Sequence, residues 1–204
     1  IGVFTQNKPE SLFMDFGAFG VRAVTVPLYA TSSEAQVHYI LEDAQIRYLF
    51  VGEQLQYDVA FRVMALSSTL KQIVVFDKDV KFDSRDESSI YMDDFLAMGK
   101  DRQHQAEVDK RTAESDTEDL MNILYTSGTT GESKGVMLSH KNLCSHLKSA
   151  MQLRPSFEWD VWLSILPLSH TLENSLSLLL PFSSGCSVYY LDKAPTPTAL
   201  LQAF

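Results

Sequence analysis

The feature that most constrains the fold is an alternation of short β-branched runs with helical patterns along the first 80 residues. A chain that repeats this order builds sheets whose faces are covered by helices. We therefore predict an α/β fold. The predicted strands are residues 1–5, 21–28, 47–51 and 72–76, and the predicted helices are 9–19, a segment that follows Thr31, and 54–66.

Residues at the helix boundaries support two of these helices. Pro9 stands in a first turn, where a helix tolerates proline, and Gly20 is expected to close that helix in a left-handed conformation. Thr31 and Glu34 have the spacing of a capping box, and apolar residues follow it at a helical period. Those residues are Val37, Ile40, Leu41 and Ala44.

A second apolar segment begins at Leu120, after an acidic stretch from residue 77 to 119 that we expect to be solvated surface. Its predicted strands are 120–125, 136–138, 161–166 and 187–191, and its predicted helices are 142–151, 172–180 and one that starts near 198; a short helix is predicted at 90–98. We predict two parts, residues 1–118 and residues 119–204, the second incomplete at its C-terminus.

Composition excludes several classes of protein. A chain of 204 residues with 45% hydrophobic and 21% charged residues is neither disordered, collagen-like nor a coiled coil, and a net charge of −9 argues against a nucleic-acid partner. No apolar run reaches the roughly 18 to 20 residues of a transmembrane helix. Cys144 and Cys186 are expected to be free thiols in a reducing compartment. Because the chain opens without Met or a signal-peptide pattern, we expect a fragment of a longer protein.

The segment that carries chemistry runs from Tyr125 to Val136, with the sequence Tyr-Thr-Ser-Gly-Thr-Thr-Gly-Glu-Ser-Lys-Gly-Val. Its glycines let successive amides turn toward one point, its hydroxyls add donors and its lysine adds a charge, a composition that suits a polyphosphate. It is not a Walker A loop, because Lys134 precedes Gly135 and a predicted strand. It is not a Gly-x-Ser-x-Gly elbow either. A flexible hairpin turn is the alternative that composition alone leaves open.

The order of residues in this run resembles the phosphate-loop signature of the AMP-forming adenylating enzymes, the superfamily of acyl-CoA synthetases, luciferases and peptide-synthetase adenylation domains. The run departs at Ser133, where the family usually carries proline. The resemblance implies the fold of these enzymes, stacked αβ subdomains with helix-covered sheets, of which the chain would supply part of the large N-terminal domain. The small C-terminal domain would be absent.

Two further segments resemble the same family. Leu166-Pro167-Leu168-Ser169-His170 is similar to its Leu-Pro-Leu-x-His segment, whose histidine lies beside the acyl carboxylate and the pantetheine tunnel. The stretch from Phe19 to Ser32 resembles the long-chain fatty acid–CoA ligases in particular. Glu173 follows His170 by one turn, and a solvated helix glutamate is the favoured interpretation for it.

The resemblance implies a two-step reaction: a fatty acid is activated by ATP to acyl-AMP and pyrophosphate, and the acyl group passes to CoA. ATP, Mg²⁺ and CoA are the implied cofactors and co-substrates. His170 and Lys134 are the implied catalytic residues, and Thr126 is the implied metal ligand. The implied phosphate-binding residues are Thr126, Ser127, Gly128, Thr129, Thr130, Gly131 and Lys134. The adenine-side, ribose-binding and C-terminal lysine residues of the family would lie beyond the fragment, which we therefore expect to be inactive alone.

Two alternatives stay open. One is an adenylating enzyme for another carboxylic acid, such as an aryl, bile or amino acid. The other is a non-catalytic domain of the same fold that binds a nucleotide or a partner protein. We expect small-molecule substrates and a cytoplasmic location, with peripheral contact to the inner membrane surface and a homodimer both left open.

Overall fold

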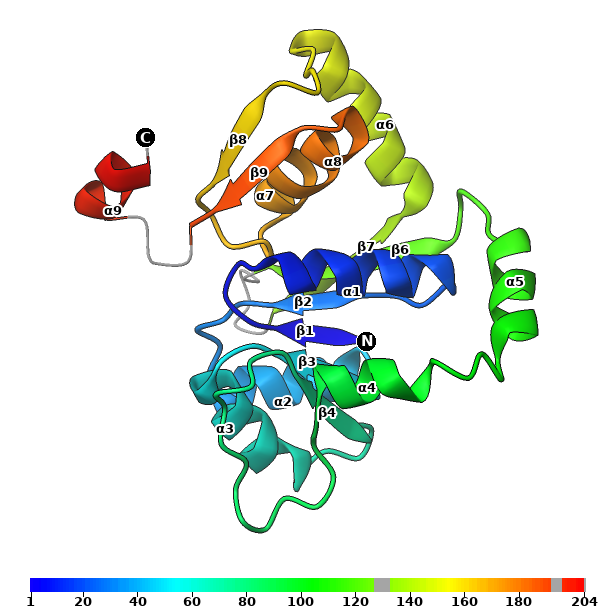
Figure 1. Ribbon diagram of the computed structural model, residues 1–204, viewed down its shortest axis with the longest axis vertical. Helices are drawn as coiled ribbons and strands as arrows, with labels where there is room; N and C mark the ends of the chain where they lie inside the picture. Colours follow the sequence, from blue (N-terminus) through cyan, green and yellow to red (C-terminus); the bar gives the residue numbers. More distant parts are fainter. Residues whose placement is uncertain (127–132, 192–195, 204) are drawn as a thin grey trace.

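The computed structural model describes residues 1–126, 133–191 and 196–203. Five strands form one sheet in the order β2-β1-β3-β4-β5, and each neighbouring pair is parallel (Figure 1). The strands are β1 (Gly2–Phe4), β2 (Val26–Leu28), β3 (Tyr48–Val51), β4 (Gln72–Val75) and β5 (Ile90–Tyr91). The helices between and after them are α1 (Pro9–Gly20), α2 (Glu34–Asp43), α3 (Gln54–Met64) and α4 (Met92–Met98). The predicted α/β fold is confirmed.

The two faces of this sheet are covered by different helices. Phe4, Leu49 and Val51 point to a core that α2 and α3 complete, whereas Val3 and Phe50 point to a second core formed with α1 and α4. Successive residues of one strand thus contribute to opposite cores, as the period of a strand requires. Parallel strands buried on both faces explain why these segments are almost continuously apolar in sequence.

Two helix boundaries differ from the prediction. Gly20 is the last residue of α1, and the left-handed residue is Arg22, with φ 59°. The Arg22 guanidinium donates to both carboxylate oxygens of Asp119, each at 2.7 Å. The capping box of α2 is formed by Ser33 and Gln36, two residues later than predicted.

The acidic stretch contains one strand and one helix that the sequence did not predict. Residues 90–91 form β5 before α4 begins, so the predicted helix is correct only from residue 92 onward. Helix α5 (Gln105–Ala113) was missed because its residues are exposed or half-buried, which leaves no apolar stripe to detect. The Thr112 hydroxyl donates to the carbonyl of Gly20 at 2.7 Å and so ties α5 to the end of α1.

The rest of the chain forms an antiparallel hairpin and a small parallel unit. The hairpin consists of β6 (Leu120–Thr126) and β7 (Lys134–Ser139) and is followed by α6 (His140–Leu153). Strands β8 (Val161–Ser164) and β9 (Ser187–Tyr190) are parallel. The predicted helix 172–180 consists of α7 (Thr171–Glu173), a π-helical stretch η1 (Asn174–Leu179) and α8 (Leu180–Ser184), and α9 is Pro197–Ala203. The division of the chain at residue 118 stays a prediction.

The hairpin is attached to the first sheet through main-chain bonds. The Thr25 amide donates to the carbonyl of Met121 at 3.0 Å, and the amide of Ile123 donates to the carbonyl of Thr25 at 2.9 Å. Side-chain packing adds to these bonds. Met121 of β6 lies in one hydrophobic cluster with Leu168 and with Phe16 and Phe19 of α1. Strand β6 therefore runs parallel to β2 and continues the edge of the sheet.

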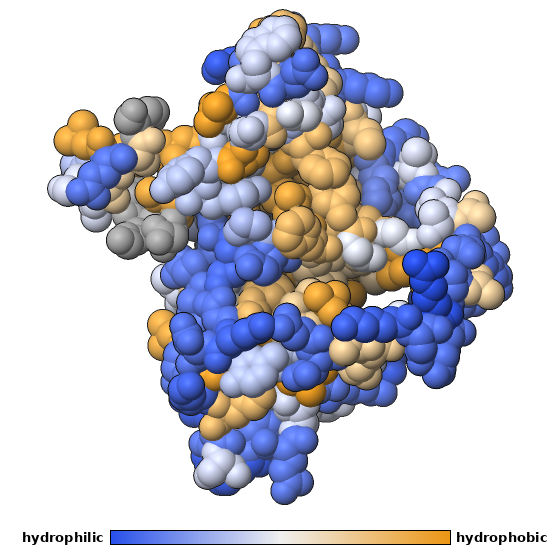
Figure 2. All heavy atoms as spheres, in the orientation of Figure 1, coloured by the Kyte–Doolittle hydropathy of each residue, from blue (hydrophilic) through white to orange (hydrophobic). Residues whose placement is uncertain are grey.

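The hydropathy of the surface differs between the region of α6 and α8 and the region of the first sheet. Figure 2 shows apolar side chains gathered over the region of α6 and α8, whereas the helices around the first sheet present a mostly hydrophilic surface. Phe182 and Leu172 are 54% and 49% exposed in this upper region. In the part of the chain that the structure describes, we find no helix both long and apolar enough to cross a membrane.

Candidate active site

Two predicted site residues lie together where the strands of the β6–β7 hairpin meet the residues that connect them. We call this end of the hairpin its mouth. Thr126 ends β6, Lys134 begins β7, and the two are directly paired across the strands. Both side chains are exposed, so the hydroxyl and the ammonium are available to a ligand. The remaining predicted phosphate-loop residues lie outside the described residues. They are Ser127, Gly128, Thr129, Thr130 and Gly131.

The residue pair next to this mouth, Tyr125 and Gly135, is tightly packed. Tyr125 is buried, its hydroxyl donates to Asp43 of α2 at 2.5 Å, and burial together with that carboxylate raises its pKa. Gly135 lies against the Tyr125 ring: a Cβ at position 135 would stand 2.8 Å from the Ile123 side chain and 3.2 Å from Tyr125. Only glycine fits this close approach. The paired ends of the loop are thus fixed to α2 and to the first sheet.

The hairpin mouth lies at the carboxyl edge of the first sheet. Because β6 runs parallel to β2, Thr126 ends at the edge where the strands of that sheet end. The same edge carries Lys8, which follows β1 and forms ion pairs with Glu53 at 2.9 Å and Asp77 at 2.8 Å. Strand order reverses between β1 and β3, and ligands of open α/β sheets bind outside the carboxyl ends of the strands at such a point.

The loop that carries His170 is bonded to Asn7, which follows β1 at the same edge. His170 ends this loop of residues 165–170, which follows β8, and its side chain is exposed. Its Nδ1 accepts from the amide of Leu172 at 3.2 Å, at the start of α7. An Nδ1 that accepts a hydrogen bond carries no proton, so the neutral ring carries its proton on Nε2. The Nε2–H has no hydrogen-bond partner among the described residues and can therefore donate to an anionic oxygen.

Glu173 is not the solvated residue that the sequence suggested. Its side chain is 5% exposed, and its Oε1 accepts from the Ser164 hydroxyl at 2.7 Å and from the Ile165 amide at 2.9 Å. The helix begins only at Thr171, so the side chain turns back toward the end of β8 instead of outward. Burial raises the pKa of Tyr190, and the nearby Glu173 adds to this shift.

Sequence reasoning also missed the environment of two polar residues, Asn7 and Asp15. Asn7 follows β1 and bonds to the loop that carries His170, but its partners stand about 160 positions away, so no local pattern could reveal it. Asp15 lies on the buried face of α1, and burial raises its pKa to about 7. Its sequence context is that of an ordinary helix residue, and only the packing of α1 shows its environment.

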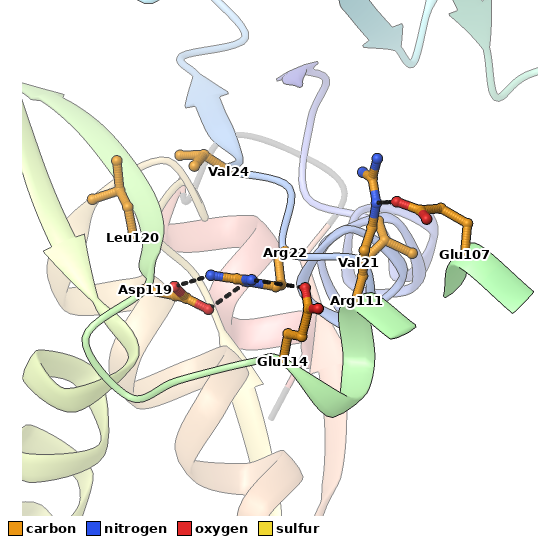
Figure 3. A pocket seen from close by; sticks show the side chains of 8 residues that line it. All are labelled: Val21, Arg22, Val24, Glu107, Arg111, Glu114, Asp119 and Leu120. Atoms are coloured by element: carbon orange, nitrogen blue, oxygen red, sulfur yellow. Dashed lines mark hydrogen bonds and ion pairs between the residues drawn. The ribbon is translucent and has the colours of Figure 1, made fainter. Parts of the chain in front are cut away.

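A separate pocket of about 430 Å³ lies between the end of α1, α5 and the start of β6 (Figure 3). Arg22 points toward Asp119 and Glu114 there, and Arg111 points toward Glu107. These charges are already paired with one another, so the pocket is a structural junction that secures α5. Cys144 and Cys186 are free, as predicted.

Comparison with known proteins identifies the family of this chain. The model of the family described as AMP-binding enzyme matches residues 1–204. Fatty acyl-CoA synthetase A of Dictyostelium discoideum is 32% identical over 195 residues, covering 91% of this chain and 27% of its own length. Long-chain-fatty-acid–CoA ligase 5 of Rattus norvegicus is 30% identical over 203 residues, covering 94% of this chain and 29% of its own length.

A solved structure shows the same fold. The anthranilate CoA ligase AuaEII in complex with anthranoyl-AMP superposes with a TM-score of 0.77 at 21% identity, over 98% of this chain and 36% of that one. The chain thus spans 27%, 29% and 36% of the length of these three proteins. The resemblance deduced from the Tyr125–Val136 run is confirmed, and the chain belongs to the AMP-binding enzyme family.

Proposed function

We propose that this chain supplies the phosphate-binding hairpin and the acid-binding histidine of an AMP-forming long-chain fatty acid–CoA ligase. The observation that carries the proposal is the placement of the Thr126–Lys134 pair at the carboxyl edge of the sheet, where the loop of His170 also lies. The names of the two sequence relatives, both fatty acyl-CoA ligases, support a fatty acid as the substrate.

The first step joins the acid to the nucleotide. A carboxylate oxygen attacks the α-phosphorus of ATP, the bond from that phosphorus to the bridging oxygen breaks, and pyrophosphate leaves with the electron pair. Lys134 would neutralise charge on the β- and γ-phosphates. The backbone amides of the Tyr125–Val136 run would donate hydrogen bonds to the same phosphates. Chemistry of this kind depends on positioning and charge neutralisation rather than on a general base.

The second step transfers the acyl group. The sulfur of CoA attacks the acyl carbonyl carbon, AMP leaves, and the thiol proton passes to solvent. In both steps His170 would donate from Nε2 to an oxygen of the acid, which holds the carboxylate for attack and later polarises the carbonyl. Because Nδ1 is occupied by the Leu172 amide, His170 acts as a donor and not as the base.

Thr126 fits a minor role in holding Mg²⁺. Its exposed hydroxyl stands beside Lys134, where the phosphates would lie, and Mg²⁺ is usually held by one or two protein oxygens together with substrate phosphates. The described residues contain no group of three His, Cys, Asp or Glu side chains that could hold the metal by themselves. The ion would draw electron density from the phosphates when it is bound.

The test is pyrophosphate release by the intact protein with MgATP and CoA, across acids from acetate to palmitate, aryl acids and amino acids. Release stimulated by long-chain acids is expected. Stimulation by another acid would keep the chemistry and replace the substrate class. Folded protein that binds ATP but stays silent with every acid would refute the proposal in favour of a non-catalytic nucleotide-binding domain.

A further inference from the structure

The loop of residues 165–170 is held by side chains from separate parts of the chain. The Asn7 side chain bonds to both sides of Pro167: its Nδ2 donates to the carbonyl of Leu166 at 2.6 Å, and its Oδ1 accepts from the amide of Leu168 at 2.8 Å. Glu173 accepts from the amide of Ile165 at 2.9 Å. Asn174 donates to the carbonyl of Leu168 at 3.3 Å.

These bonds replace the strand pairing that Pro167 prevents. A proline offers no amide donor, so the loop cannot continue β8 in a regular ladder. Asn7 instead presents one donor and one acceptor, as a neighbouring strand would. The loop closes on itself where the amide of His170 donates to the carbonyl of Pro167 at 2.8 Å, and the carbonyl of His170 accepts from the amide of Asn174 at 2.9 Å.

We propose that Asn7 and Glu173 are positioning residues for His170: together they fix the 165–170 loop over the end of β1 and thereby aim Nε2 of His170 at the acid. The proposal rests on the function proposed above. Asn7 ties the loop to β1 in the first sheet, and Glu173 ties its beginning to the helix that His170 caps. Neither side chain contacts the substrate in this assignment, so each acts through the histidine.

The placement of the two residues supports this role. Glu173 is buried and stands three residues after His170, so its bonds to Ser164 and Ile165 connect the two ends of the loop. Asn7 anchors the middle of the loop from outside. With both anchors in place, the Nδ1 of His170 meets the amide of Leu172, and the ring has one orientation with Nε2 outward. Without them, the loop loses its only side-chain support at residues 165 and 166 among the described residues.

We expect Glu173 and Asn7 to respond differently to conservative substitution. Glu173→Gln keeps an oxygen acceptor for both bonds and should retain activity within about threefold, whereas Glu173→Leu should lower kcat for acid-dependent pyrophosphate release by about tenfold. Asn7→Asp places a carboxylate oxygen against the carbonyl of Leu166 and should lose as much as Asn7→Ala, about fivefold to tenfold. The KM for ATP should stay the same in all four variants.

A double-mutant cycle separates positioning from general stability. In a His170→Ala background, Asn7→Ala and Glu173→Leu should change kcat by less than about twofold, because their effect passes through the missing ring. Thr69→Val is the matched control: it removes two hydrogen bonds, to the carbonyls of Leu41 and Ile46, at the opposite edge of the sheet. It should lower the melting temperature and leave kcat unchanged.

A readout that needs no activity keeps this proposal separate from the proposed function. The ¹⁵N shifts of labelled histidine in the intact protein report the tautomer, and His170→Ala identifies the signal. We expect the Nε2–H form in the wild type and a mixture of forms in Asn7→Ala. This result with an inactive wild type would support the positioning role while refuting the ligase. A wild-type Nδ1–H form, unchanged kcat in Asn7→Ala and Glu173→Leu, or losses that add fully to His170→Ala, would overturn the proposal.

Discussion

The five-stranded sheet and the segment from Ser164 to Ser177 differ in the kind of side chains that they bury. Strands β1, β3 and β4 bury Val, Phe, Leu and Ile side chains on both faces. The later segment buries six polar residues within 14 positions. They are Ser164, Ser169, Glu173, Asn174, Ser175 and Ser177. Regular strands satisfy each other's amides and carbonyls, so their side chains can be apolar, whereas an irregular loop needs side-chain partners.

This difference separates stability from function along the chain. The sheet buries apolar side chains, whereas in the polar segment Glu173 and Asn174 bond to the loop that carries His170. A substitution in the sheet should therefore act on the free energy of unfolding. A substitution in the hairpin mouth or the loop should act on catalysis.

The largest expected effect is on the sheet. Phe50 of β3 is 1% exposed and packs against Phe76 and Phe95, with ring centroids 6.0 and 5.2 Å away. Phe50→Ala should lower the free energy of unfolding by about 3–5 kcal/mol, measured by urea titration of the intact protein. Leu55→Ala is the control, since Leu55 is 63% exposed on α3 and should cost little. A loss below about 1 kcal/mol for Phe50→Ala would contradict the described core.

The second prediction concerns the boundary between the two regions. Asp15 of α1 and Asn174 of η1 line a cavity of about 20 Å³, and the Oδ1 atoms of both have no hydrogen-bond partner among the described residues. Burial raises the pKa of Asp15 from 3.8 to about 7. The Asp15 carboxyl therefore holds its proton more tightly in the folded state than in the unfolded state. Its contribution to the free energy of unfolding is complete below pH 3.8 and is lost as the pH rises through about 7.

Asp15→Asn removes that titration. Relative to the wild type, the variant should gain about 2–3 kcal/mol in its free energy of unfolding between pH 5 and pH 8, measured by urea titration at each pH. Glu10→Gln, at a half-buried position of the same helix, is the control. A constant difference between Asp15→Asn and wild type across this range would show that Asp15 titrates normally.

The third prediction moves to the hairpin mouth. Lys134 is exposed, so Lys134→Ala should leave the melting temperature unchanged. Loss of one charge-assisted contact with the phosphates should lower kcat/KM for MgATP by about tenfold to a hundredfold. Lys148→Ala, at an exposed position of α6, is the control for a simple change of net charge. Unchanged ATP kinetics in Lys134→Ala would refute the placement of the phosphates at this mouth.

The sequence predicted the sheet region well because its signals are local. The strand expected at 47–51 is β3, and that at 72–76 is β4, since burial on both faces leaves an apolar run that can be recognised by itself. The capping box shifted from Thr31 to Ser33 because both residues are good caps, and only the turn that precedes the helix selects between them.

The site was predictable only where its residues are neighbours in sequence. The Tyr125–Val136 run places Thr126 and Lys134 on the two sides of one hairpin, and the structure pairs them. Glu173 was misjudged because its partners are fixed by the start of the helix at Thr171, which sequence periodicity located only to within a residue. Asn7 was missed because its role depends on packing between distant segments.

The smallest expected effect tests whether irregular backbone in the sheet region lacks the support that the polar segment provides. Gln45 follows α2 in a left-handed conformation, with φ 52°, and its side chain is exposed. A residue with a Cβ pays about 1 kcal/mol for this conformation, which glycine adopts freely. Gln45→Gly should therefore raise the free energy of unfolding by up to about 1 kcal/mol, reduced by the greater freedom of glycine in the unfolded chain. Gln45→Ala, which keeps the Cβ, is the matched control and should gain nothing. If both variants changed stability equally, the left-handed conformation would carry no strain, and the sheet region would be as well supported at its turns as the loop of His170.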